Sequence, residues 1–160
     1  MRPRRLAGVS YRGYRRYFLT ICTFSRRSCF THADIVRDVW LQFVETANAN
    51  DFDVIAYCFM PDHLHVLVEG TNDATDLRIF VSTAKQRAAY AARSWIRGRL
   101  WQPGCYERIL REDEDVFDVV RYILQNPVRA GLVRSPGEYP FLGGIVAVDE
   151  LSDSVSWRPR

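Results

Sequence analysis

The sequence lacks the patterns that define several large classes of protein. It has no apolar run long enough to cross a bilayer, and no apolar signal segment follows its first arginines. It contains no internal repeat, glycine-rich phosphate loop, Gly-x-Ser-x-Gly elbow or zinc-type spacing of cysteine and histidine. We therefore expect one cytoplasmic domain of 160 residues with its own core and no membrane partner.

Disulfide bonds are not expected either. The sequence has four cysteines, none of them in a Cys-x-x-Cys pair, and three lie in apolar surroundings. This usage is typical of reduced thiols in a cytosolic protein.

Lysine is nearly absent, and acidic residues are missing from the first part of the chain. Lys85 is the only lysine among 22 basic residues, and the first 33 residues hold eight arginines but no acid. A second basic block covers residues 78–111, although the net charge is only +3. Two such blocks indicate a polyanionic partner such as nucleic acid. A solvated surface in an arginine-rich proteome would give the same composition.

Two of the three histidines lie close together in the apolar segment of residues 54–70. Pro61 and Asp62 interrupt this segment, which predicts a β-hairpin. Side chains alternate across a strand, so His63 and His65 share the face opposite the core, ~6.6 Å apart along the strand. Both rings could then bind one metal ion. Two ordinary strand histidines would show the same spacing, and a third ligand must come from elsewhere in the chain.

The remaining pattern predicts an α+β fold. Its order is strand, helix, hairpin, helix, strand, that of a ferredoxin-like sandwich with an antiparallel β-sheet and helices packed on one face. The flanking elements are expected at residues 17–24, from Thr31 or Asp34 to 49, at 77–95 and at 105–110. Residues 1–16 are expected to form a basic N-terminal arm, 17–141 the domain and 142–160 a C-terminal tail.

A further amphipathic helix is expected between a cap at Asp113 and Pro127. Its apolar residues have clean helical spacing, and they are Val116, Val119, Val120, Ile123 and Leu124. Tyr122 and Asn126 fall together on the flank of this apolar stripe, from which a phenol and an amide could reach the exposed face of the sheet. A surface tyrosine and a helix-terminal asparagine are the alternative interpretation.

Three segments together resemble the single-tyrosine HUH transposases, and among them the REP-associated tyrosine transposases of bacteria. They are MPDHLH at residues 60–65, WQPGCYERILR at 101–111 and YILQNPVRAGLV at 122–133. HUH denotes histidine, hydrophobic residue, histidine. The resemblance covers residues 14–141 and also implies the ferredoxin-like fold.

The resemblance implies a metal-dependent nuclease site. His63 and His65 match the two metal-binding histidines, Asn126 occupies the position of the third ligand, and Tyr122 matches the nucleophile. Mg²⁺ or Mn²⁺ is the implied cofactor, although imidazole ligation would also suit other metals. Tyr106 and Tyr90 are rival nucleophiles.

The implied substrate is single-stranded DNA with palindromic, REP-like hairpins, which is cleaved through a 5′-phosphotyrosine intermediate. The protein is expected to be associated with the nucleoid, as a monomer or a homodimer. Two alternatives remain, a hairpin-binding protein that does not cut and a metal-dependent phosphodiesterase that uses water. The candidate DNA-binding residues are Arg4, Arg5, Arg15, Arg16, Arg78, Lys85 and Arg87.

Overall fold

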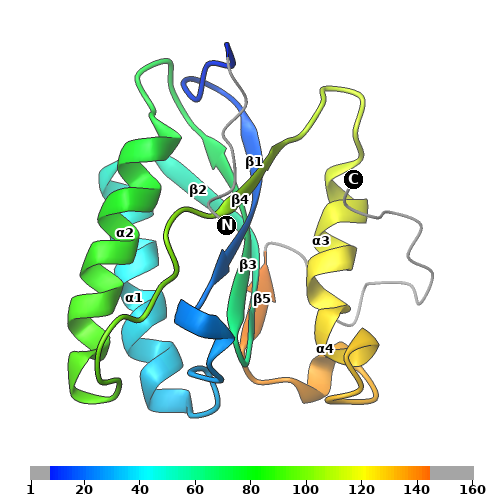
Figure 1. Ribbon diagram of the computed structural model, residues 1–160. Helices are drawn as coiled ribbons and strands as arrows, with labels where there is room; N and C mark the ends of the chain where they lie inside the picture. Colours follow the sequence, from blue (N-terminus) through cyan, green and yellow to red (C-terminus); the bar gives the residue numbers. More distant parts are fainter. Residues whose placement is uncertain (1–7, 145–160) are drawn as a thin grey trace.

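The computed structural model describes residues 8–144, and the statements below concern these residues. At its centre is a five-stranded antiparallel sheet with the strand order β4-β1-β3-β2-β5 (Figure 1). The strands are β1 (Arg16–Cys22), β2 (Phe52–Met60), β3 (His63–Gly70), β4 (Tyr106–Ile109) and β5 (Leu142–Gly144). The first four strands have the order and direction of a ferredoxin-like sheet, as predicted.

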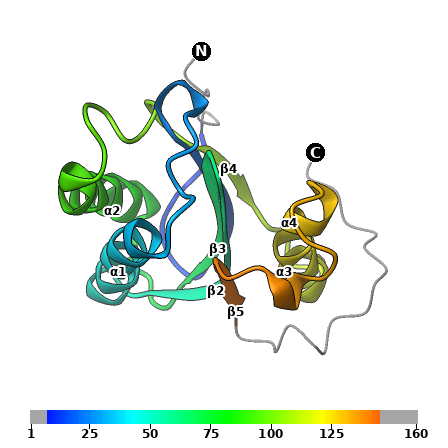
Figure 2. The same cartoon turned by 90° about the horizontal axis from the view of Figure 1, so that it is seen from below.

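Helices cover both faces of this sheet (Figure 2). On one face lie α1 (Ala33–Ala49) and α2 (Leu77–Ala91), which are the two helices of the predicted sandwich. On the other face lie α3 (Val116–Leu124) and the short α4 (Asn126–Arg129). The prediction of helices on one face is therefore correct for α1 and α2 and incomplete for the molecule. Three-residue 3₁₀ turns occupy Phe24–Arg26, Ala92–Ser94 and Pro136–Glu138.

The β3 strand shows why two separate cores form. Leu64, Val66 and Val68 are fully buried against the α1 and α2 layer, whereas Leu67 is buried against α3. Alternate side chains of one strand thus serve opposite cores. Because both faces are covered at its centre, Val66, Leu67 and Val68 are consecutive apolar residues.

The α3 helix uses the apolar stripe that the sequence predicts. Val119, Val120, Ile123 and Leu124 are fully buried, and Val116 packs against the same cluster. Two boundary predictions were wrong. Asp115, not Asp113, caps the helix by accepting a hydrogen bond from the Phe117 amide. Asp113 lies instead inside a turn in which the Glu114 amide donates to the Arg111 carbonyl. Pro127 does not end helical structure, because it lies in the first turn of α4, where its missing N–H costs little.

The segment just before β1 is docked on the domain. Tyr11 is buried in the core of the α1 and α2 side, and its carbonyl accepts a hydrogen bond from the Leu77 amide. Gly13 lies so close to Gly70 that a side chain at position 70 would collide with its carbonyl. The second half of the predicted arm therefore packs on the fold, and residues 1–7 lie outside the described residues.

The last described residues also belong to the fold. Leu142, Gly143 and Gly144 pair with β2, so the sheet extends beyond the predicted domain end at residue 141. The rest of the predicted tail, residues 145–160, lies outside the described part of the chain. Within residues 8–144, no helix has the length and apolar character needed to cross a membrane.

Candidate active site

The two histidines of β3 converge on one point. They lie on the same face of the strand, and their Nε2 atoms are 3.1 Å apart. The Nδ1 atom of His63 is 2.7 Å from Asp62 Oδ1 in the hairpin turn. The Nδ1 atom of His65 is 2.9 Å from the hydroxyl of Thr20, its neighbour on β1. Each ring is thus held through Nδ1 and directs Nε2 toward the other ring.

Burial keeps both imidazoles neutral. It lowers the pKa of His65 to about 3, and the charges of His63 and Arg129 act in the same direction. Burial also lowers the pKa of His63, against the opposing effect of Asp62. Neutral imidazole is the form that binds metal ions, so the pair is prepared for ligation at neutral pH.

The donor set fits a divalent cation. If both Nδ1 atoms carry hydrogen and donate to Asp62 and Thr20, both Nε2 lone pairs point into the same space. One ion with imidazole bonds of ~2.0–2.1 Å can reach both atoms. Among the described residues, no group of three or more His, Cys, Asp and Glu could hold a metal. Within the described residues, an amide oxygen is the kind of group that could add to the two imidazoles.

Tyr122 comes to this pair from the other layer. Its ring centre is 6.3 Å from that of His65, and both rings contact Phe18, at 5.9 Å for Tyr122 and 5.3 Å for His65. Because α3 is anchored by its apolar stripe, the flank that carries Tyr122 faces the histidines. The structure thus brings together a phenol and two imidazoles from separate elements.

Asn126 lies at the junction of α3 and α4, where it is buried. Its Nδ2 donates to the carbonyls of Tyr122 and Ile123, at 2.9 and 3.3 Å. The amide nitrogen is therefore fixed by the backbone, and Oδ1 is the atom that could bind a cation. Asn126 is thereby held one turn after Tyr122, as its spacing in the sequence predicts.

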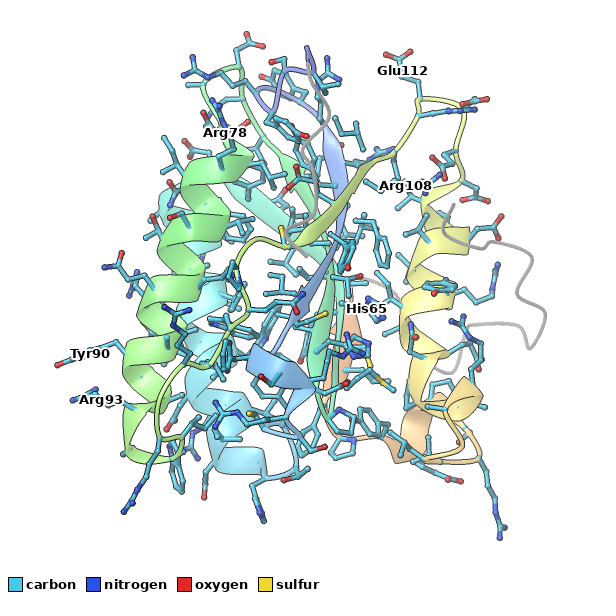
Figure 3. The ribbon with its side chains drawn as sticks, viewed as in Figure 1. His65, Arg78, Tyr90, Arg93, Arg108 and Glu112 are labelled. Atoms are coloured by element: carbon cyan, nitrogen blue, oxygen red, sulfur yellow. The ribbon has the colours of Figure 1, made fainter. Side chains whose placement is uncertain are left out.

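The rival tyrosines differ in position. Tyr90 lies on the outer side of α2, on the far side of the sheet from His65 (Figure 3). Tyr106, on β4, lies opposite Thr20 of β1, and Thr20 lies opposite His65 of β3. Tyr106 is therefore on the same face of the sheet as the histidines, two strands away from His65 at ~10 Å. Tyr122 is the tyrosine in ring contact with His65.

The candidate DNA-binding residues also fall into two groups. Arg15 and Arg16 lie at the start of β1, beside a hollow of about 390 Å³ that Tyr14 and Arg111 also line. Arg16 pairs with Glu69 at 3.0 Å. Arg4 and Arg5 lie outside the described residues.

The basic residues of α2 lie in the layer opposite the histidines, and Figure 3 shows Arg78 at the end of α2 where the helix begins. Each has a partner within the chain. Arg78 pairs with Asp76, Lys85 donates to the carbonyls of Gln102 and Gly104, and Arg87 contacts Gln42 and Glu45. The structure does not bring these residues to the site.

Sequence reasoning missed the residues that support the histidines and the tyrosine. Arg26 donates to Asp62 Oδ2 at 2.8 Å. Burial alone would raise the pKa of Asp62, but His63 and Arg26 outweigh it and lower that pKa. A role for Asp62 in holding the histidine could have been suspected from its place beside His63. The contact of Arg26 with Asp62 depends on the turn at Phe24–Arg26, which no sequence pattern predicts.

Comparisons with known proteins identify the family. A family model described as transposase IS200 like matches residues 14–126. The chain belongs to the IS200-like transposase family. The segment matched contains the two histidines, Tyr122 and Asn126, and the family agrees with the resemblance found in the sequence.

Individual relatives agree with this assignment. The REP-associated tyrosine transposase of Escherichia coli K12 is 27% identical in an alignment 140 residues long, which covers 80% of this chain and 79% of that protein. A Haemophilus influenzae protein named for the same class is 24% identical in an alignment 136 residues long, which covers 78% of this chain and 77% of that protein. A solved REP-associated tyrosine transposase bound to a REP hairpin superposes with a TM-score of 0.77 at 21% identity and covers 99% of both chains. This last match supports the fold.

Proposed function

We propose that this protein is a metal-dependent single-stranded DNA endonuclease and strand transferase that acts on palindromic repeat hairpins through a 5′-phosphotyrosine at Tyr122. The observation that carries the proposal is the position of the Tyr122 ring beside His65, whose Nε2 meets that of His63 at 3.1 Å. Binding DNA alone would not require a phenol at a pair of neutral, convergent imidazoles.

His63 and His65, with the amide oxygen of Asn126, would hold the cation, Mg²⁺ or Mn²⁺. When bound, such an ion supplies positive charge that polarises a phosphate and stabilises charge in the transition state. Asp62 and Thr20 hold the rings so that both Nε2 atoms face the site.

Tyr122 would act as the nucleophile. Its hydroxyl oxygen forms a bond to phosphorus, and the bond from phosphorus to the 3′ oxygen of the upstream nucleotide breaks. The phenolic proton leaves to solvent, and the departing 3′ oxygen takes up a proton. The products are a 5′-phosphotyrosyl protein and a free 3′-OH. The number of phosphoester bonds is unchanged, so the 3′-OH of another strand can reverse the step without ATP.

The choice of hairpin DNA rests on the named relatives and on charge. The relatives belong to the REP-associated class, and one solved member is bound to a REP hairpin. In this chain, Arg15, Arg16 and Arg111 line one hollow with the exposed ring of Tyr14; Glu69, which pairs with Arg16, and Glu112 line it as well. Guanidinium groups with an aromatic ring are suited to the backbone and bases of a single strand.

The test is formation of a covalent adduct. Wild-type protein, Tyr122→Phe and Tyr106→Phe are incubated with labelled single-stranded hairpins and Mn²⁺, then separated by denaturing electrophoresis. The proposal expects an adduct with wild type and Tyr106→Phe, and none with Tyr122→Phe or with chelator.

Each alternative has its own signature. Tight hairpin binding without an adduct or cleavage, across several hairpins, would indicate a protein that binds and does not cut. Cleavage without an adduct that persists in Tyr122→Phe would indicate a phosphodiesterase that uses water. An adduct that disappears only in Tyr106→Phe would reassign the nucleophile.

A further inference from the structure

Arg129 is a basic residue that touches the proposed nucleophile. It ends α4, and its guanidinium carbon lies 4.0 Å from the ring centre of Tyr122. One of its terminal nitrogens is 3.5 Å from Asn126 Oδ1. The α3–α4 junction thus places an arginine over the ring of Tyr122 and beside the proposed third ligand.

The charge of Arg129 has no acidic counterpart among residues 8–144. Other arginines around this face do have one: Arg26 pairs with Asp62, Arg16 with Glu69 and Arg121 with Asp118. Arg129 instead contacts an aromatic face and an amide, and its charge contributes to the lowered pKa of His65. A guanidinium that is not paired with a carboxylate can bind an anion without first breaking an ion pair.

We propose that Arg129 binds the non-bridging oxygens of the scissile phosphate and, after attack, those of the phosphotyrosine. This inference rests on the proposed function and adds a catalytic residue to it. A phosphate brought to the Tyr122 hydroxyl lies beside the guanidinium, whose planar donors match two phosphate oxygens. Charge on those oxygens is spread and shifted as phosphorus is transferred, so a fixed positive group there favours the transition state.

A purely orienting role is the competing explanation, in which Arg129 only holds the Tyr122 ring by a cation–π contact. The two roles differ in what they require of the phosphate. An orienting contact is indifferent to the charge on the scissile phosphate, whereas a phosphate contact depends on it.

The experiment measures single-turnover adduct formation by wild type, Arg129→Gln and Arg129→Lys on a cleavable hairpin. Arg129→Gln should be slower by ~10²-fold, the usual effect of removing one transition-state donor, and Arg129→Lys should recover part of this rate. Thermal unfolding of Arg129→Gln should match wild type, and rates measured at saturating hairpin exclude any difference in hairpin affinity. Arg134→Gln, at an exposed arginine five residues later, is the matched control and should react at the wild-type rate.

The decisive comparison repeats these rates on a hairpin with a methylphosphonate at the scissile position, which lacks one negative charge. The wild-type to Arg129→Gln ratio should then fall toward one, because the charge that Arg129 contacts is absent. An unchanged ratio, or an Arg129→Gln rate equal to wild type on the ordinary hairpin, would overturn the inference while leaving the tyrosine nuclease intact. Absence of any wild-type adduct would instead overturn the proposed function.

Discussion

The side chain of Asp62 connects the first histidine to the rest of the fold. One oxygen contacts His63 Nδ1 at 2.7 Å and the other accepts from Arg26 at 2.8 Å, while Thr23 holds the Asp62 carbonyl. The carboxylate is therefore held at both of its oxygens, and the backbone of Asp62 is held separately by Thr23. A carboxylate bound in this way orients a metal-binding imidazole and increases its basicity.

We expect Asp62→Ala to weaken Mn²⁺ binding by ~10–100-fold, because His63 would lose the partner that orients Nε2. Isothermal titration calorimetry of the DNA-free protein measures this directly. Asp34→Ala removes a carboxylate whose ion pair with Arg37 is exposed, so it should bind Mn²⁺ like wild type. Equal affinities in Asp62→Ala and wild type would show that Asp62 has no role in positioning the histidine.

His65 makes stability depend on pH in the metal-free protein. Its pKa is about 3 in the fold and 6.5 in an ordinary setting, so between these values the unfolded chain binds more protons. The contribution of neutral His65 to the free energy of unfolding should therefore be fully present above pH 6.5 and be lost as the pH is lowered toward 3. Urea unfolding in chelator at several pH values measures this slope, which should be shallower in His65→Gln. An identical slope in the variant would contradict the buried, neutral state of His65.

At the scale of the elements, α3 is the part of the fold on which the site depends. Its buried stripe sets the rotation of the helix, and the rotation in turn places Tyr122 against His65 and Phe18. A change in the stripe should therefore affect both stability and chemistry.

Ile123→Ala tests this dependence, since Ile123 is fully buried and adjacent to Tyr122 in sequence. We expect the free energy of unfolding to fall by ~2–5 kcal/mol, because apolar burial is removed and a cavity is left behind. Adduct formation should slow as well, even where the variant is folded. Phe117→Ala on the same helix is the control, because Phe117 is 52% exposed, and it should change stability by less than ~1 kcal/mol. A similar destabilisation in both variants would contradict the account of α3.

The elements that could be predicted from sequence are those with an unambiguous period. Alternation in β3 placed His63 and His65 on one face, and helical spacing in α3 placed Tyr122 beside the core. The contact of Arg129 with Tyr122 could not be predicted, because it depends on how the chain turns between α3 and α4. The docking of Tyr11 depends likewise on a contact with the distant start of α2. Periodicity within one element carries no information about such contacts between elements.

At the scale of the whole molecule, the two sides of the sheet differ in chemistry. The histidines and Tyr122 lie between the sheet and α3, whereas the basic residues of α2 lie in the opposite layer and have partners in the chain. Sequence alone could show that residues 78–93 are basic, but it could not show that the fold turns them away from the histidines. The hollow beside Arg15 and Arg111 lies where β1 begins and β4 ends.

We therefore expect Arg15→Gln with Arg111→Gln to weaken hairpin binding and to reduce its dependence on salt. The slope of log affinity against log salt should fall by about 0.7 for each DNA phosphate that the protein no longer neutralises. Arg78→Gln with Arg87→Gln removes the same charge from α2 and should leave the slope unchanged. Fluorescence anisotropy at several salt concentrations measures both, and a reduced slope only in the α2 variant would place the DNA on the other layer.

The most direct measurement of the central claim is mass spectrometry of the protein after reaction with a hairpin and Mn²⁺, nuclease digestion and proteolysis. The peptide containing Tyr122 should gain a nucleotide joined through its 5′ phosphate, and this mass should be absent with chelator. A nucleotide found on Tyr106 or another residue, or cleaved DNA with no modified peptide, would contradict the account.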